Sequence, residues 1–193
     1  MLTPTAGVYL LDRTRLVLLI EEPKRWRGSV RVGLPGGSVE EGETRAQCAF
    51  RECLEEVGVR PELVSARKTF QLADENLIGI AEPTRGEVAP LTRHTLAKGD
   101  WSIDGAGFIA KYSMQVPLAI DALAVVKLKL SVVRSLPPTG PIEELFSKVE
   151  VVSAKNNYKA ALLPNYSVAP GLKYLMDQPE MLSELSAVTQ MRS

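Results

Sequence analysis

Short apolar runs bounded by polar residues recur along the chain and predict a succession of β-strands. The first two are Ala6–Leu11 and Leu16–Glu21, joined by a turn of polar residues from Asp12 to Thr14. Alternation of apolar and polar positions is clearest from Phe108 to Val116. The other predicted strands are Leu63–Gln71, Leu77–Ala81, Val126–Val132 and Lys148–Ala154.

One segment has the pattern of an amphipathic helix with defined ends. Thr44 followed by Gln47 fits a capping box, and Gly58 suits the left-handed conformation found just past many helices. At 100° per residue, the carboxylates of Glu52, Glu55 and Glu56 fall within one arc. A different arc carries the apolar side chains of Ala46, Ala49, Phe50, Cys53 and Val57. The helix should therefore bury one side and present three acids together on another.

The remaining segments predict one domain with a mixed sheet between helices. Pro23–Val32 is expected to be a loop, and Glu82–Asp100 is polar and contains prolines, which favours a long irregular segment near 82–107. Helices are predicted at Gly171–Asp177 and Met181–Val188. Since no linker or internal repeat divides the chain, residues 1–193 are expected to form a single α/β domain with a helical C-terminal end.

The positions of the three acids should destabilise the helix, and this cost favours a function for them. Like charges at i, i+4 repel, and Glu55 and Glu56 occupy the last turn, where the helix dipole disfavours anions. A solvated acidic face is the alternative. Hard divalent cations such as Mg²⁺ prefer oxygen ligands, so a metal site accounts better for the cluster.

The stretch Gly37–Val59 resembles the Nudix box, a pattern of the form Gly-x5-Glu-x7-Arg-Glu-U-x-Glu-Glu-x-Gly-U in which U is a bulky aliphatic residue. The matching positions are Gly37, Glu43, Arg51, Glu52, Glu55, Glu56, Gly58 and Val59. Cys53 departs from the pattern, because an aliphatic residue is usual there. A buried cysteine behaves as a small hydrophobe, so the chemistry should be unaffected.

The resemblance implies an α/β/α sandwich and a hydrolase that cleaves the pyrophosphate of a nucleoside diphosphate linked to another moiety, as in a nucleoside triphosphate, a nucleotide sugar or a similar compound. It further implies Mg²⁺ or Mn²⁺ held by Glu52, Glu55, Glu56 and the carbonyl of Gly36. Catalytic roles would fall to Glu43, Arg51, Glu52 and Glu55, with Arg51 holding a glutamate in place. Gly37 would let the backbone approach the substrate closely.

A further carboxylate from outside the box is expected to complete the metal site. Glu143 and Glu144 follow a proline-rich turn, Ser135–Gly140, and are predicted to precede a strand. Because strand alternation lets only one of two neighbours face the site, Glu144 is chosen. Ordinary surface acids are the alternative interpretation of this pair.

The segment before the glycine turn supplies candidate substrate contacts. Arg25 and Arg27 could grip phosphates while Trp26 stacks on a base. A solvated loop whose tryptophan covers the edge of the core explains the same residues equally well.

Composition restricts partners and location. The chain has 23 basic and 23 acidic residues, and this balance disfavours nucleic acid. Two cysteines five positions apart on one helix should not pair, which suits a reducing cytoplasm. Neither a signal peptide nor a membrane span is expected. The partner is then a small nucleotide derivative, with a homodimer possible. A non-catalytic nucleotide-sensing module is the alternative function, although such modules usually lack box glutamates.

Overall fold

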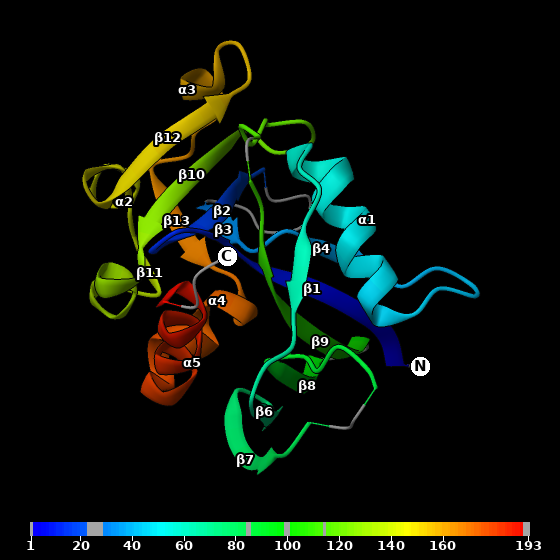
Figure 1. The fold of residues 1–193 in the computed structure, drawn as a ribbon. Helices are drawn as coiled ribbons and strands as arrows, with labels where there is room; N and C mark the ends of the chain where they lie inside the picture. Colours follow the sequence, from blue (N-terminus) through cyan, green and yellow to red (C-terminus); the bar gives the residue numbers. More distant parts are fainter. Residues whose placement is uncertain (1, 23–28, 84–85, 99–100, 114, 191–193) are drawn as a thin grey trace.

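The computed structural model describes residues 2–22, 29–83, 86–98, 101–113 and 115–190, and it contains one large mixed sheet (Figure 1). The main path of the sheet runs β11-β13-β3-β2-β1-β9-β8-β6-β7. Off this path, β10 joins β2 and β12, β4 joins β1, and β5 joins β9. The strands are β1 (Leu2–Asp12), β2 (Arg15–Glu21), β3 (Ser29–Gly33), β4 (Gly36–Ser38), β5 (Glu62–Val64), β6 (Thr69–Ala73), β7 (Asn76–Ala81), β8 (Thr92–Lys98), β9 (Trp101–Lys111), β10 (Ala124–Lys129), β11 (Thr139–Pro141), β12 (Val149–Ala154) and β13 (Asn165–Val168).

Helices lie on both sides of this sheet, so the predicted α/β/α sandwich is confirmed. They are α1 (Arg45–Val57), the 3₁₀ helix η1 (Leu130–Ser135), α2 (Ile142–Lys148), α3 (Tyr158–Ala161), α4 (Pro170–Asp177) and α5 (Pro179–Gln190). In Figure 1, α1 stands on one side of the strands, and α4 and α5 stand on the other. Successive side chains of a strand point to opposite faces, which is why one sheet can support two separate layers.

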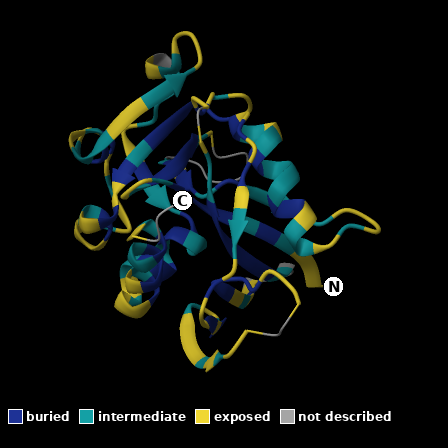
Figure 2. Ribbon diagram, viewed as in Figure 1, coloured by how far each residue is buried: buried dark blue, intermediate teal, exposed yellow. Residues whose placement is uncertain are grey.

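Two apolar cores follow from that alternation. On the α1 face, Val8 and Leu10 of β1 pack with Phe108 of β9 and Cys53 of α1. On the opposite face, Tyr9, Ile109 and other alternate residues of the same strands pack with α2, α4 and α5. The strands at the centre are therefore buried on both faces, as the dark band in Figure 2 shows. This double burial fixes the position of α1 relative to the strands and turns that precede it.

Strand β9 lies between β1 and β8 and pairs with strands that are distant in the sequence. β9 pairs in parallel with β1 from Leu2↔Ser102 to Leu11↔Lys111, and antiparallel with β8 and β5. It was predicted only from Phe108 onward and through Val116, whereas it begins at Trp101 and ends at Lys111. Gly105 and Gly107 explain the missed half: a Cβ on Gly107 would come within 2.5 Å of the Tyr9 ring. These glycines make room for packing and do not mark a loop.

Two other segments predicted as loops are strands. β3 begins within the predicted loop Pro23–Val32 and ends one residue beyond it, and β8 lies inside Glu82–Asp100. Both are short and carry polar residues, but each is held by main-chain pairing on two sides. Backbone hydrogen bonds do not depend on side-chain character, so polar strands of this kind escape a search for apolar runs. The predicted strand Leu63–Gln71 is instead divided into β5 and β6.

Candidate active site

The helix that carries the acids begins and ends where its caps predict. The Thr44 hydroxyl accepts a hydrogen bond from the Gln47 amide at 3.2 Å, and the Gln47 side chain accepts one from the Thr44 amide at 2.8 Å. Gly58 has φ of 68°, in the left-handed region. Cys48, Ala49, Cys53 and Val57 are buried against the sheet. Because both ends are fixed, the acidic arc faces the loop that precedes the helix.

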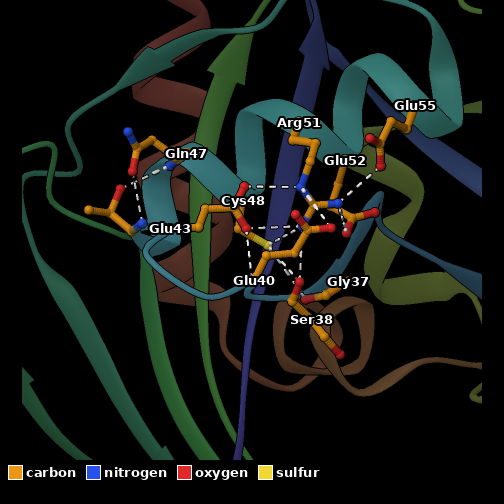
Figure 3. Close-up of polar contacts among 10 residues, drawn as sticks. Gly37, Ser38, Glu40, Glu43, Gln47, Cys48, Arg51, Glu52 and Glu55 are labelled. Atoms are coloured by element: carbon orange, nitrogen blue, oxygen red, sulfur yellow. Dashed lines mark hydrogen bonds and ion pairs between the residues drawn. The ribbon is translucent and has the colours of Figure 1, made fainter.

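Arg51 is the centre of the site (Figure 3). Its Nε and Nη2 each donate to one oxygen of Glu43, both at 3.0 Å. Its Nη1 donates to Glu52 Oε1 at 2.8 Å and to Glu55 Oε2 at 3.0 Å. Nη2 also donates to the carbonyl of Ser38 at 3.0 Å. One guanidinium therefore joins three box glutamates to the loop, and the fork geometry of arginine makes this possible.

Two of the carboxylates that bind Arg51 have opposite pKa shifts. The hydrogen bonds from Arg51 and then from the Glu40 amide lower the pKa of Glu43. Burial raises the pKa of Glu52 in spite of its bond to Arg51. Glu52 lies directly against Gly37, where an added Cβ would come 2.2 Å from Glu52 Oε1. Gly37 therefore leaves the space that the Glu52 carboxylate occupies, a reason for the glycine that the sequence pattern does not reveal.

Glu56 is held separately from the Arg51 group. The amide of Gly36 donates to Glu56 Oε2 at 2.8 Å. Burial raises the pKa of Glu56 to about 8; the Gly36 bond lowers it, while the charges of Glu21, Glu52 and Asp121 raise it. An acid buried among other acids is a place where a cation would be stabilised.

Glu21 and Asp121 are acids near the site that the sequence did not single out. Glu21 ends β2, and Asp121 lies in the segment just before β10. That segment is tied to the end of α1, because the Leu118 amide donates to the Val57 carbonyl at 2.9 Å. Neither acid belongs to a motif, so only the pairing of β2 with β10 and this contact bring them close to Glu56.

The placement of Glu144 predicted from the sequence is wrong. Glu144 lies in the first turn of α2, not ahead of a strand, and pairs with Lys148 at 2.8 Å. Ile142 and Leu145 of α2 pack in the core on the face of the sheet opposite α1. Helix α2, which carries Glu144, therefore packs on the opposite face of the sheet from α1. The other predicted contacts, Arg25, Trp26 and Arg27, lie outside the described residues.

The glycine turn before α1, residues 34–37, contacts helix α4 near the C-terminal end of the chain. Helix α4 is itself held against β1, because the Tyr9 hydroxyl donates to the Gly171 carbonyl in α4 at 3.2 Å. An added Cβ on Gly171 would lie 3.0 Å from Cδ1 of Leu34, which is two residues before Gly36. The carbonyl of Pro35, between them, accepts from the Val8 amide at 2.9 Å. Helix α4 therefore packs closely on the Leu34 side chain, two residues before the amide that binds Glu56.

We expect Gly171→Val to disturb the site from a distance. The added side chain would push Leu34 and the adjoining turn, and since a displacement of about 1 Å can cost about 10²-fold, we expect kcat to fall on the order of tenfold. Kinetics of the variant measure this. Adding Leu34→Ala should restore part of the lost activity. An unchanged kcat for Gly171→Val would show that the turn does not depend on α4.

Both cysteines are free and fully buried. Burial raises the pKa of the Cys53 thiol above its usual range and that of Cys48 to about 11. Arg51 Nη2 also donates a hydrogen bond to Cys48 Sγ at 3.5 Å, so Cys48 helps to hold the guanidinium in place. Neither thiol has the lowered pKa of a reactive cysteine.

Cys53→Ser should lower the free energy of unfolding by roughly 1–3 kcal/mol, because it places a hydroxyl among apolar side chains. Chemical denaturation measures this, and metal affinity should change little. In the native wild type, thiol reagents should label both cysteines slowly. Rapid labelling of Cys53 would contradict the orientation of α1.

The oxygen atoms gathered at the site are of the chemical type that binds divalent metal ions. The carboxylates of Glu52, Glu55 and Glu56 and the Gly36 carbonyl are hard oxygen ligands of the sort that Mg²⁺ and Mn²⁺ accept. Across the described ranges, no three His, Cys, Asp or Glu side chains form a ready metal cage. Arg51 engages two of the three glutamates, so Glu52 and Glu55 would turn from Arg51 to ligate.

Fold and site together define a class of protein: a sandwich in which one loop and helix gather glutamates around an arginine. The chain belongs to the Nudix family, since the family model of the NUDIX domain matches residues 1–101. Family membership supports a hydrolase of a nucleoside diphosphate linked to another moiety as the general class, and Nudix hydrolases generally use divalent metal ions.

Solved structures share the fold at low identity. A Nudix-family hydrolase from Clostridium perfringens aligns with TM-score 0.55 and 11% identity over 94% of this chain and 96% of that one. The E. coli ORF135 protein aligns with TM-score 0.52 and 15% identity over 99% and 93%. This chain spans 57% of a Nudix hydrolase from Nitrosomonas europaea, with TM-score 0.44, 20% identity and 66% of this chain aligned. No curated protein matches the chain. Within the described residues, no helix has the length and apolar character needed to cross a membrane.

Proposed function

We propose that this protein hydrolyses the pyrophosphate bond of a nucleoside diphosphate linked to another moiety, with a divalent cation. The observation that carries the proposal is the grouping of Glu43, Glu52 and Glu55 around Arg51, with Glu56 on the Gly36 amide beside them. A sensing module needs no such set of acids.

Glu52, Glu55 and Glu56, with the Gly36 carbonyl, would hold Mg²⁺ or Mn²⁺. When bound, the metal neutralises phosphate charge and lowers the pKa of a coordinated water. Arg51 and Glu43 keep the acidic side of α1 oriented, since Glu43 binds the guanidinium through both oxygens. Gly37 leaves the space that Glu52 occupies and lets substrate approach the backbone.

Glu55 is our choice for the group that accepts the proton of the attacking water. Its side chain is 55% exposed, whereas that of Glu52 is 12% exposed. An exposed carboxylate can contact a water and pass the proton on to solvent. Glu52 remains the second choice, because it belongs to the same acidic arc.

Asp121 and Glu21, rather than Glu144, are our candidates for the carboxylates from outside the box. Both influence Glu56 electrostatically, and both come from segments outside the box. We propose that they complete the negative environment around the metal. In addition, Arg25, Arg27 and Trp26 remain candidates for substrate binding, and the free buried cysteines favour a reducing compartment such as the cytoplasm.

The deciding experiment is a panel of nucleoside triphosphates and nucleotide conjugates assayed with Mg²⁺, with Mn²⁺ and with chelator. We expect release of a nucleoside monophosphate or pyrophosphate product only when metal is present. Tight nucleotide binding without turnover of any panel member would favour the sensing module instead.

A further inference from the structure

A pocket of about 810 Å³ opens beside the first turn of α1, at the far end of the helix from Glu55 and Glu56. Its floor is the α1 face of the sheet beyond the helix. There Gln71 of β6, Arg93 of β8 and Ala106 of β9 lie side by side in register. Thr44 and Arg45, at the start of α1, form one wall, and the other wall includes Glu82, Pro83 and residues 87–90.

The pocket is continuous with the glutamate site. Glu43 lines it while binding Arg51 through both oxygens. Val39 also lines it and follows Ser38, whose carbonyl binds Arg51. Gly37, which contacts Glu52, is two residues from Val39, or about 7 Å of extended chain. A ligand whose pyrophosphate lies at Glu52 can therefore extend a second group into the pocket.

The lining indicates what that second group is. Arg45 is paired with Asp104 and Glu43 with Arg51, so their charges are already balanced. Among the described residues, the side chains of Arg93, Gln71, Glu82 and Glu87 have no hydrogen-bond or ion-pair partner. Among the described lining residues, one cation and two acids therefore lack a partner, and this balance disfavours a second anionic group.

The hydrogen-bonding groups and the shape of the pocket suit an uncharged group that carries hydroxyls. Free carboxylates accept from hydroxyl groups, and the guanidinium and amide donate to hydroxyl oxygens. Val39, Ala106 and Phe108 add an apolar side against which a ring can pack. The volume lies within the range of small-molecule pockets, about 300–1,000 Å³.

We propose that this pocket binds an uncharged, hydroxyl-rich moiety, such as a sugar, joined to the nucleoside diphosphate. The proposal rests on the proposed function, because it places the pyrophosphate at Glu52. It narrows the substrate class to nucleotide sugars and their relatives, in preference to simple nucleoside triphosphates.

Equilibrium binding tests the pocket without turnover. We would measure the affinities of UDP-glucose and ADP-glucose against UDP and ADP, using Glu56→Gln so that substrate persists. Test variants are Arg93→Ala and Gln71→Ala in that background; both side chains are exposed, so the fold should survive, and thermal unfolding confirms it. Arg134→Ala, which removes an exposed arginine of η1 remote from the pocket, is the matched control.

We expect at least one sugar conjugate to bind about tenfold tighter than its parent diphosphate. Arg93→Ala and Gln71→Ala should remove most of that difference and leave the affinity for the diphosphate unchanged, while Arg134→Ala changes neither. Equal affinities for conjugates and diphosphates would overturn the pocket assignment, as would a preference that both variants retain. Metal-dependent hydrolysis of a nucleoside triphosphate by the wild type would still support the proposed function in that case.

Discussion

Glu56→Gln should reduce kcat on the order of 10²-fold or more, and Glu52→Gln should do the same. Each change keeps the shape of the side chain and removes one ligand charge, and metal neutralisation is worth several kcal/mol. Steady-state kinetics on a substrate identified by the panel measure the loss. Glu41→Gln, an exposed acid in the loop before α1, is the matched control and should retain wild-type kcat.

Glu56→Gln should lower kcat without lowering the thermal stability of the protein. A loss of activity in a variant that folds normally indicates a chemical role for Glu56, not a structural one. A carboxyl with a raised folded-state pKa costs stability as pH rises from its unfolded pKa toward about 8, because the folded state resists ionisation. Glu56→Gln removes that cost. In chelator at pH 8, its Tm should therefore equal or exceed that of the wild type. Full activity in both glutamine variants would refute the proposed site.

Arg51→Lys should lower kcat by about 10²-fold. A lysine retains the charge but has one compact ammonium group, so it cannot bind Glu43 through both oxygens while also holding Glu52 and Glu55. The carboxylates would then separate, and small displacements of reacting groups carry large rate penalties.

The control for Arg51→Lys is Arg67→Lys. Arg67 pairs with a single carboxylate, Glu184, at 3.0 Å, so a lysine can replace it there. Activity of that variant should remain within about twofold of wild type, because the lysine keeps a positive charge beside Glu184 in α5, on the face of the sheet opposite α1. If Arg51→Lys were equally mild, Arg51 would not organise the glutamates.

The helix and its acidic arc could be predicted because they depend on local rules. A capping box, a left-handed glycine and a 3.6-residue period involve neighbours in sequence, and the structure bears out each of them. The acids from outside the box that influence Glu56 could not be predicted in this way. Asp121 and Glu21 approach Glu56 through strand pairing and a backbone contact, and neither leaves a pattern in the sequence.

The strand errors have a related cause. β8 and the first half of β9 contain polar residues and glycines that resemble a loop. Their strand character comes from partners as distant as β1, and Gly107 is small because the Tyr9 ring lies over it. The predicted placement of Glu144 directly ahead of a strand was wrong for the same reason: Glu144 follows a turn, but it lies in α2, and only the sheet determines which face α2 covers.

The parallel pairing of β1 with β9 also has a consequence for synthesis of the chain. Leu2 and Ser102 are partners, so β1 cannot gain this neighbour until about a hundred more residues have been made. At roughly 5–20 residues per second, β1 waits on the order of 5 to 20 s. During that time Val8 and Leu10 lack the core that later buries them, and one strand edge is unpaired. The nascent chain should therefore depend on chaperones, and slow, non-local pairing should set its folding rate.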